Sequence, residues 1–177
     1  RFTQDGKGVI YSAGFDGNPL ELFATDVTGS ESRSFGIQSA ALKSVSSSGK
    51  MAVLLNFELN FSDGYNGTLA ILPADGGQPE VVGDGIDDAA LAPDGNTFAI
   101  IRSVMGEQQL EYPVGTAIYK SGGWMSYPRF SPKGDKIAFF EHPLGDFSGS
   151  VAVYDLATKK KIDLQTDWKS LKGLAWN

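Results

Sequence analysis

One short phrase recurs four times in this chain: an apolar stretch, a polar turn with a glycine, and a second apolar stretch. The four copies read FTQDGKGVIYSA at residues 2–13, VSSSGKMAVLL at 45–55, LAPDGNTFAII at 91–101 and FSPKGDKIAFF at 130–140. Their turn glycines are separated by 43, 46 and 39 residues and are Gly6, Gly49, Gly95 and Gly134. A period of about 40–50 residues that opens on a turn indicates a radial or stacked array of β-sheets.

Each repeat contains several short strands joined by polar turns. The runs after the turn glycines are rich in β-branched and aromatic residues and lie at 8–13, 51–55, 97–101 and 136–140. Because these runs are almost continuously apolar, we expect both faces of each strand to be buried. Weaker strand signals follow each run, and a further strand precedes each glycine turn, as at 125–131. The pattern predicts four antiparallel strands per repeat, which is the blade of a β-propeller.

We therefore predict an all-β chain that forms one β-propeller segment over residues 1–177. The blade units are expected at about 1–38, 39–85, 86–123 and 124–170, with 171–177 as the first strand of a next blade. If the four units closed on themselves, residues 171–177 and 1–3 would compete for one position. The pattern favours a segment of a larger ring, or an open half-ring that self-associates through unpaired strand edges.

The composition is that of an ordinary folded domain and excludes several classes of function. The formal net charge is -6, which argues against a nucleic-acid partner because binding to phosphates needs clustered positive charge. The chain contains no cysteine, so disulfides and thiolate metal sites are excluded. No apolar run is long enough to cross a bilayer, so we expect no direct membrane insertion.

The turn glycines are expected to have a structural role. A glycine accepts the positive φ of a tight hairpin turn, and a neighbouring Asp or Asn caps the backbone. The sequence has no Gly-x-Ser-x-Gly motif, and the stretch at 48–50 lacks the upstream glycine and the following Ser or Thr of a phosphate-binding loop. We therefore expect neither a hydrolase nucleophile elbow nor a cofactor.

His142 is the one histidine of the chain, and it follows the apolar run at 136–140. A single histidine excludes multi-histidine metal sites, and any Ser-His-Asp triad would depend on this position. Glu141 and Asp146 are the carboxylates close enough in sequence to act with it. The alternative, which we favour, is a loop histidine whose ring is hydrogen-bonded to the backbone.

Two acidic loops, at 63–67 and 84–88, combine oxygen ligands with glycines, as Ca²⁺ sites do. Neither matches the twelve-residue calcium loop with its closing Glu, so we interpret both as solvated turns and expect no bound metal. The basic run at 159–161 is interpreted as a hairpin turn as well.

Aromatic side chains are the main candidates for a binding surface. Exposed aromatic residues at one end of a propeller would form a binding face, built here on the loops at 56–67, 106–123 and 141–149. The candidate binding residues are Phe61, Tyr65, Tyr112, Trp124, Tyr127 and His142. The alternative is packing between blades, which we favour for Trp124 and Trp176.

The phrases FSPKGDKIAF at 130–139 and LAPDGN at 91–96 resemble the SPDG-type repeat of TolB-like β-propellers. In that repeat an apolar strand follows, and then a second strand that ends in Asp, as at Asp26 and Asp155. The resemblance spans essentially the whole chain, although the second repeat departs from it at 47–49. It implies a propeller with a sensing or interaction role and no catalysis of its own, although the family also includes propellers that gate peptidases.

A narrower resemblance connects residues 120–155 and 174–176 with propellers that follow the kinase domain in some bacterial membrane-linked Ser/Thr kinases. It is carried by GGWMS at 122–126, EHP at 141–143 and GSVAV at 149–153. It implies a bacterial sensor module, expected in the periplasm or at the cell surface. The cytoplasm is the alternative, because a chain without cysteine suits either compartment.

We therefore expect a non-catalytic module that recognises a protein or a small-molecule ligand, within a larger bacterial receptor or kinase-type protein. The alternative is an accessory or gating propeller of a peptidase or of a polymer-cleaving enzyme. A polymer-cleaving site within this chain would need convergent carboxylates, or a histidine with a partner, at one end of the ring. Assembly of open half-rings is a third expectation.

Overall fold

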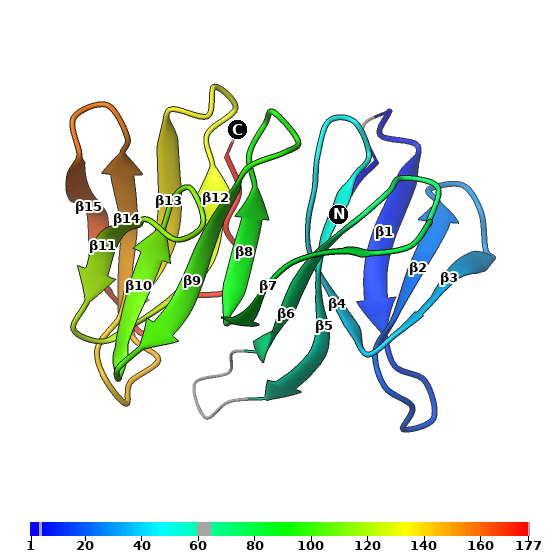
Figure 1. Cartoon of the computed structure of the whole chain (residues 1–177), viewed down its shortest axis with the longest axis horizontal. Helices are drawn as coiled ribbons and strands as arrows, with labels where there is room; N and C mark the ends of the chain where they lie inside the picture. Colours follow the sequence, from blue (N-terminus) through cyan, green and yellow to red (C-terminus); the bar gives the residue numbers. More distant parts are fainter. Residues whose placement is uncertain (4, 60–64, 177) are drawn as a thin grey trace.

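The computed structural model describes residues 1–3, 5–59 and 65–176, and these residues form an all-β chain. Its strands make four antiparallel sheets, each built from consecutive strands of the sequence (Figure 1). The expectation of a propeller segment with one sheet per repeat is confirmed. Within these ranges the chain has no helix long and apolar enough to span a bilayer.

The sheets follow the sequence order. The first contains β1 (Gly8–Ala13), β2 (Glu21–Asp26) and β3 (Ser32–Gln38). The second contains β4 (Ala40–Val45), β5 (Met51–Leu59), β6 (Tyr65–Leu72) and β7 (Glu80–Ile86). The third contains β8 (Asp88–Leu91), β9 (Phe98–Val104), β10 (Glu107–Glu111) and β11 (Ala117–Ser121). The fourth contains β12 (Trp124–Phe130), β13 (Lys136–His142), β14 (Gly149–Asp155) and β15 (Lys160–Trp168).

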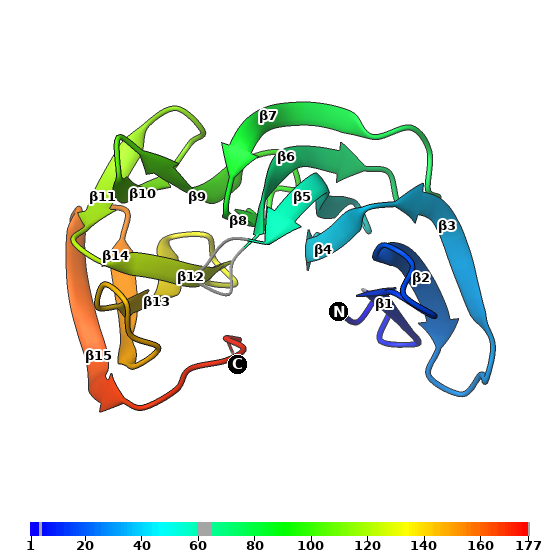
Figure 2. The ribbon, with the colours of Figure 1, turned by 90° about the horizontal axis from the view of Figure 1, so that it is seen from below.

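The four sheets stand around a common centre and form an open arc (Figure 2). Strands β4, β8 and β12 lie on the inner side of their sheets, and β3, β7, β11 and β15 lie on the outer side. The gap in the arc separates the first sheet from the fourth, and both termini face this central space. Side chains from β4, β8 and β12 therefore meet near the centre.

The first sheet departs from the expected four strands. Three strands form it, and residues 1–3 take the innermost position through one bridge between Phe2 and Val9. The backbone N–H of Thr3 donates to Gly8 O at 2.9 Å, which closes the turn around Gly6.

The segment 171–177, expected as the first strand of a next blade, forms no strand within its described part, 171–176. Instead it runs toward the centre of the arc (Figure 2). Trp176 Nε1 donates to Arg129 O at 3.0 Å, so the segment is anchored on β12. An innermost strand forms by pairing with the next strand of its own blade, and no described residue supplies that partner.

Apolar side chains fill the spaces between neighbouring sheets. The stretches 51–54, 98–101 and 137–140 are buried throughout, so the expectation of strands buried on both faces is confirmed for β5, β9 and β13. β1 is only partly buried because it belongs to an end sheet of the arc. Each space has its own cluster: Ile10, Leu22 and Met51 between the first two sheets, Leu54, Leu69 and Ile100 in the middle, and Leu110, Ile137 and Phe139 between the last two.

The four turn glycines share one geometry. Their φ angles are 67°, 81°, 71° and 72° for Gly6, Gly49, Gly95 and Gly134. Each glycine N–H donates to the carbonyl three residues earlier, at 2.8 to 3.0 Å. The left-handed region is readily accessible only to glycine, which accounts for a glycine at the same place in all four repeats.

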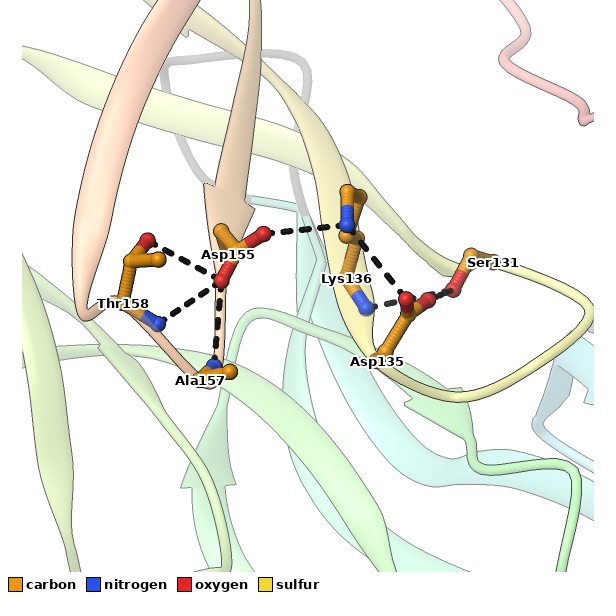
Figure 3. Close-up of polar contacts among 6 residues, drawn as sticks. All are labelled: Ser131, Asp135, Lys136, Asp155, Ala157 and Thr158. Atoms are coloured by element: carbon orange, nitrogen blue, oxygen red, sulfur yellow. Dashed lines mark hydrogen bonds and ion pairs between the residues drawn. The ribbon is translucent and has the colours of Figure 1, made fainter.

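Asp155 ends the second strand of the fourth repeat, and its carboxylate contacts two turns of the fourth sheet (Figure 3). Asp155 accepts hydrogen bonds from Ala157 N at 3.1 Å and from Thr158 N at 2.8 Å. Its other oxygen pairs with Lys136 Nζ at 2.9 Å, next to the Ser131–Asp135 hydrogen bond of the glycine turn. The Thr158 amide and the Lys136 ammonium hold the pKa of the Asp155 carboxyl well below its usual value. The aspartate thus has a structural role.

Candidate functional site

A pocket of about 710 Å³ opens on the inner side of the arc. Its walls come from β4, β8 and β12, from the start of β6 and from the coil at 170–172. Four of the six candidate binding residues line it, namely Tyr65, Trp124, Tyr127 and His142. The pocket therefore brings together residues that the sequence places far apart.

An aromatic wall of the pocket is formed by Trp124, His142 and Phe147. The Trp124 and His142 rings stack with centroids 3.6 Å apart and planes inclined by 8°. Phe147 meets the indole edge to face at 5.9 Å. Trp124 Nε1 donates to Asp146 O at 3.0 Å, so the β13–β14 connection fixes the indole.

His142 is 2% exposed, and both of its ring nitrogens have hydrogen-bond partners. Ser148 O lies 2.9 Å from Nδ1, and because a carbonyl only accepts, Nδ1 carries the proton. Nε2 then accepts from the Ser126 hydroxyl at 3.2 Å. Burial lowers the pKa of His142 below its usual value, so the ring is neutral at pH 7.

The two carboxylates next to His142 in sequence make their contacts elsewhere. Glu141 accepts hydrogen bonds from Tyr119 and Ser121, both at 2.7 Å, and pairs with Lys161 at 2.5 Å. Burial opposes ionisation of Glu141, but these donors, Lys161 foremost, bring its pKa below the usual value. Asp146 accepts from Ser148 N at 2.9 Å.

Ser126 and His142 therefore form a pair without the third member of a hydrolase triad. The group that orients the imidazole is a backbone carbonyl, which carries no charge to stabilise an imidazolium. The arrangement that the sequence allowed, His142 with Glu141 or Asp146, does not occur among the contacts of the described residues. The geometry favours the alternative expected from sequence, a histidine held by hydrogen bonds.

An ion pair between Lys43 and Asp88 links β4 to β8 at the wall of the pocket. Lys43 Nζ lies 3.2 Å from Asp88 Oδ1, and the side chains are 11% and 15% exposed. The same ammonium lies 4.9 Å from the centre of the Tyr65 ring. The N–H of Tyr127 donates to Asp88 Oδ2 at 2.9 Å, at a bulge in β12 where Tyr127 adopts a φ of 54°. Asp88 thus joins three inner strands.

Asp87 lies beside this group and is 4% exposed. Its carboxylate accepts from Asn66 Nδ2 at 2.8 Å, and from Ser103 Oγ and Gln108 Nε2 at 3.0 Å each. Gln108 Oε1 in turn accepts from Met125 N at 2.5 Å. These bonds satisfy the carboxylate, so the network links the second, third and fourth sheets.

The acidic loop at 84–88 therefore contributes to the framework of the pocket. The described residues contain no group of three or more His, Asp or Glu side chains arranged to hold a metal ion. Of the other acidic loop, 63–67, Asp63 and Gly64 lie outside the described residues.

Arg129 gives the pocket an unsatisfied positive group. Its Nε is buried and has no hydrogen-bond partner among the described residues. Nη1 donates to Pro128 O at 2.6 Å, and the guanidinium lies 5.8 Å from the centre of the Tyr127 ring. Four cationic residues line the pocket against two carboxylates, which are already bonded: Arg1, Lys43, Arg129 and Lys172 against Asp87 and Asp88. The pocket is positive although the chain as a whole is acidic.

The remaining candidates lie elsewhere. Tyr112 packs edge to face on Phe130, 5.1 Å away, in the core between the third and fourth sheets. Phe61 lies outside the described residues. The region 106–123, expected as a loop, contains β10 and β11.

The sequence analysis did not single out Lys43 or Arg129, and it considered Asp88 only within the acidic loop at 84–88. For Arg129 a usable signal was present, because a charged residue lies inside the strand expected at 125–131.

A larger groove, of about 920 Å³, lies between the second and third sheets. Apolar side chains such as Ile71, Val81, Phe98 and Val114 line much of it, and polar turn residues border it. None of the candidate residues lines this groove. The inner pocket is therefore the better candidate site.

Four radial antiparallel sheets around a central pocket define the class of the protein as a β-propeller. No family model matches the chain, and neither does any curated protein sequence. Solved structures do match. TolB from Acinetobacter baumannii is 21% identical with a TM-score of 0.73, and the match covers 93% of this chain and 42% of that one. The putative TolB from Agrobacterium tumefaciens is 17% identical with a TM-score of 0.76, over 93% of this chain and 63% of that one.

An oligogalacturonate lyase solved in complex with manganese matches as well, at 15% identity and a TM-score of 0.58, over 93% of this chain and 51% of that one. At these identities the matches show the fold alone, and the expected TolB-like β-propeller fold is confirmed. The chain spans 42% to 63% of the length of these three proteins.

Proposed function

We propose that this chain is a non-catalytic recognition module that binds its ligand in the inner pocket. The observation that carries the proposal is the position of Arg129, whose buried Nε has no partner among the described residues while its guanidinium lines an aromatic pocket. A buried donor without a partner costs about 1–3 kcal/mol, and a ligand that accepts its hydrogen bond removes that cost.

The chemistry of the walls defines the ligand class. Trp124 and Tyr127 offer flat apolar surface, and Arg129 with Lys43 offers positive charge. A guanidinium suits a carboxylate, which it binds through two parallel hydrogen bonds. The ligand that fits is an aromatic or apolar group next to a carboxylate, presented by a protein segment or by a small molecule.

The proposed setting is a larger bacterial protein. The module is proposed to lie outside the cytoplasm, as the narrower resemblance to kinase-linked propellers implies, with a sensing role in a receptor or kinase-type chain. The TolB structures support this setting through fold only. Blades give a rigid scaffold on which pocket residues vary freely, which suits recognition.

A gating or accessory propeller of an enzyme is the alternative. A prolyl endopeptidase structure matches 96% of this chain and 29% of its own length, at 13% identity and a TM-score of 0.60. That likeness concerns the fold alone. Within the described chain the Ser126–His142 pair lacks a carboxylate partner, so catalysis by this pair is not proposed.

The test is a binding screen with aromatic carboxylates, each paired with its amide. NMR of the Trp124 indole N–H reports binding, and wild type is expected to bind the acids and not the amides. Arg129→Gln should weaken binding about ten-fold, the loss of one charged hydrogen bond worth about 1.4 kcal/mol. Arg33→Gln, outside the pocket, is the matched control and should bind as wild type. Equal binding of acids and amides, or by Arg129→Gln and wild type, contradicts the proposal.

A further inference from the structure

Three hairpins at one end of the arc carry exposed apolar side chains at their tips. Because consecutive strands are antiparallel, the β1–β2, β9–β10 and β13–β14 connections all emerge at the same end, the lower one in Figure 1. Phe15, Met105 and Leu144 are 55%, 102% and 83% exposed. They belong to three different sheets, so the feature recurs along the arc.

The side chain of Met105 does not serve the fold. It forms a two-residue turn with Gly106, and both residues have a positive φ, 52° and 86°. Asn and Gly are the favoured residues in such turns, because a larger side chain is strained at positive φ. Met105 is fully exposed, so packing gives it no compensating gain. A residue that breaks a local rule without benefit to the fold indicates function.

The opposite end of the arc differs. There the four glycine turns consist mainly of polar residues, such as the Asp5-Gly6 and Asp94-Gly95 pairs. Asp94 accepts hydrogen bonds from Asn96 N at 2.8 Å and from Thr97 N at 3.0 Å, so these polar residues stabilise their own turns. In the β2–β3 connection at this opposite end, Val27 is 53% exposed, so the contrast between the two ends concerns the four glycine turns.

Carboxylates surround the apolar tips. Asp16 follows Phe15, Glu107 follows the Met105 turn, and Asp146 lies two residues after Leu144. All three are exposed. The connecting segments 14–20, 105–106 and 143–148 contain no Lys or Arg. Glu107 also pairs with Lys120 of β11, whose Nζ lies 3.4 Å from Oε2. The connecting segments themselves are apolar at their tips and contain the carboxylates Asp16 and Asp146 without a cationic residue.

We propose that this end of the arc is a docking surface for a protein partner whose own surface presents apolar sockets surrounded by Lys and Arg. Apolar anchors of this size supply contact area, and methionine adapts to irregular sockets. The carboxylates between them select a basic partner and accelerate its association. An anionic lipid surface does not fit, because the carboxylates would approach its phosphates.

This surface is distinct from the inner pocket, since none of Phe15, Met105 and Leu144 lines that pocket. The proposal therefore stands independently of the carboxylate site. Arg129→Gln should leave docking at the tips unchanged.

The test uses a phage-displayed random peptide library selected on the folded 177-residue chain. Selected peptides are synthesised and their affinities measured by calorimetry for wild type and variants. We expect sequences that combine Lys or Arg with Leu, Phe, Trp or Met. The selected peptides should bind the double variant Met105→Asn, Leu144→Ser about ten-fold more weakly than wild type. The double variant Asp16→Lys, Glu107→Lys should also lower their affinity, and this loss should be largest at low salt.

Val81→Thr is the matched control, because Val81 is 61% exposed on β7 and belongs to another surface. It should bind like wild type, and circular dichroism should show that all variants fold. Selection of acidic peptides, or equal binding by wild type and the Met105/Leu144 variant, overturns the proposal. Sedimentation with phosphatidylcholine vesicles that depends on Met105 and Leu144 would assign the surface to lipid and overturn it as well.

Discussion

The indole of Trp124 lies flat on the imidazole of His142, with the ring centroids 3.6 Å apart. The imidazole is in turn held by Ser148 O on one nitrogen and by the Ser126 hydroxyl on the other. The stack thus connects β12, β13 and the β13–β14 connection, and it forms one wall of the inner pocket. Burial disfavours the charged imidazolium and lowers the pKa of His142, so the ring in this stack is neutral and Nε2 accepts from the Ser126 hydroxyl.

Stability should therefore depend on the protonation of His142. Burial lowers its pKa below the usual value of 6.5, so the unfolded chain takes up the proton first as the pH falls. The contribution is fully present above about pH 6.5 and is lost progressively below it, down to the pKa of the folded state. Wild type should lose denaturant resistance between about pH 7.5 and pH 5 more steeply than His142→Gln. Parallel pH dependence of the two midpoints in urea unfolding would contradict this.

Asp87 should be one of the most sensitive polar positions of the chain. Replacement by Ala leaves the amides of Asn66 and Gln108 and the Ser103 hydroxyl without their shared acceptor. We expect a loss of about 3 kcal/mol in the free energy of unfolding, measured by urea titration. Asp84→Ala is the control, because Asp84 is exposed and accepts one bond from Thr68. A similar loss in both variants would show that the buried network has no special role.

The turn glycines should differ in their tolerance of a side chain. At Gly6 an added Cβ meets nothing within 4 Å, whereas at Gly49 it lies 2.9 Å from the Cβ of Ala74. Gly6→Ala should therefore cost only the strain of a positive φ, about 1 kcal/mol. Gly49→Ala should cost about 1–2 kcal/mol more, because the neighbouring backbone has to move. Thermal unfolding measures both, and equal losses would mean that the Ala74 contact relaxes freely.

The fold could be predicted from local signals, because each repeat places a glycine turn before an apolar run. The run at 136–140 lies within β13, and the glycine turns have the expected positive φ. The site could be predicted only in part. Trp124, Tyr127 and His142 are close in sequence, and strands β12 and β13 pair directly.

The charged part of the pocket depends on long-range contacts that no local pattern encodes. Lys43 and Asp88 come from different sheets, and they meet because β4 and β8 are both innermost strands. Tyr112 illustrates the reverse case. It belongs to an irregular stretch, after a bulge in β10, yet its ring packs into a core. The irregular sequence of this stretch therefore did not mean that Tyr112 is exposed.

One face of the fourth sheet is not covered by another sheet (Figure 2). Ala152 and Tyr154 point toward the third sheet, so the alternating residue Val153 and its partner Ile162 point away from it. On that side Ile162 and Leu164 are 56% and 62% exposed. The first sheet lies at the other end of the arc and carries the stacked rings of Tyr11 and Phe23.

Apolar side chains on both end faces make contact between the first sheet of one copy and the fourth sheet of another the expected mode of self-association. We expect the isolated 177-residue chain to self-associate with rising concentration, and sedimentation velocity measures this directly. Ile162→Thr, Leu164→Thr should weaken association about ten-fold, because about 100 Å² of apolar surface is worth about 2.5 kcal/mol before losses. Val81→Thr, on the second sheet, should associate as wild type does. A wild-type chain that stays monomeric throughout would show that the end faces do not pair.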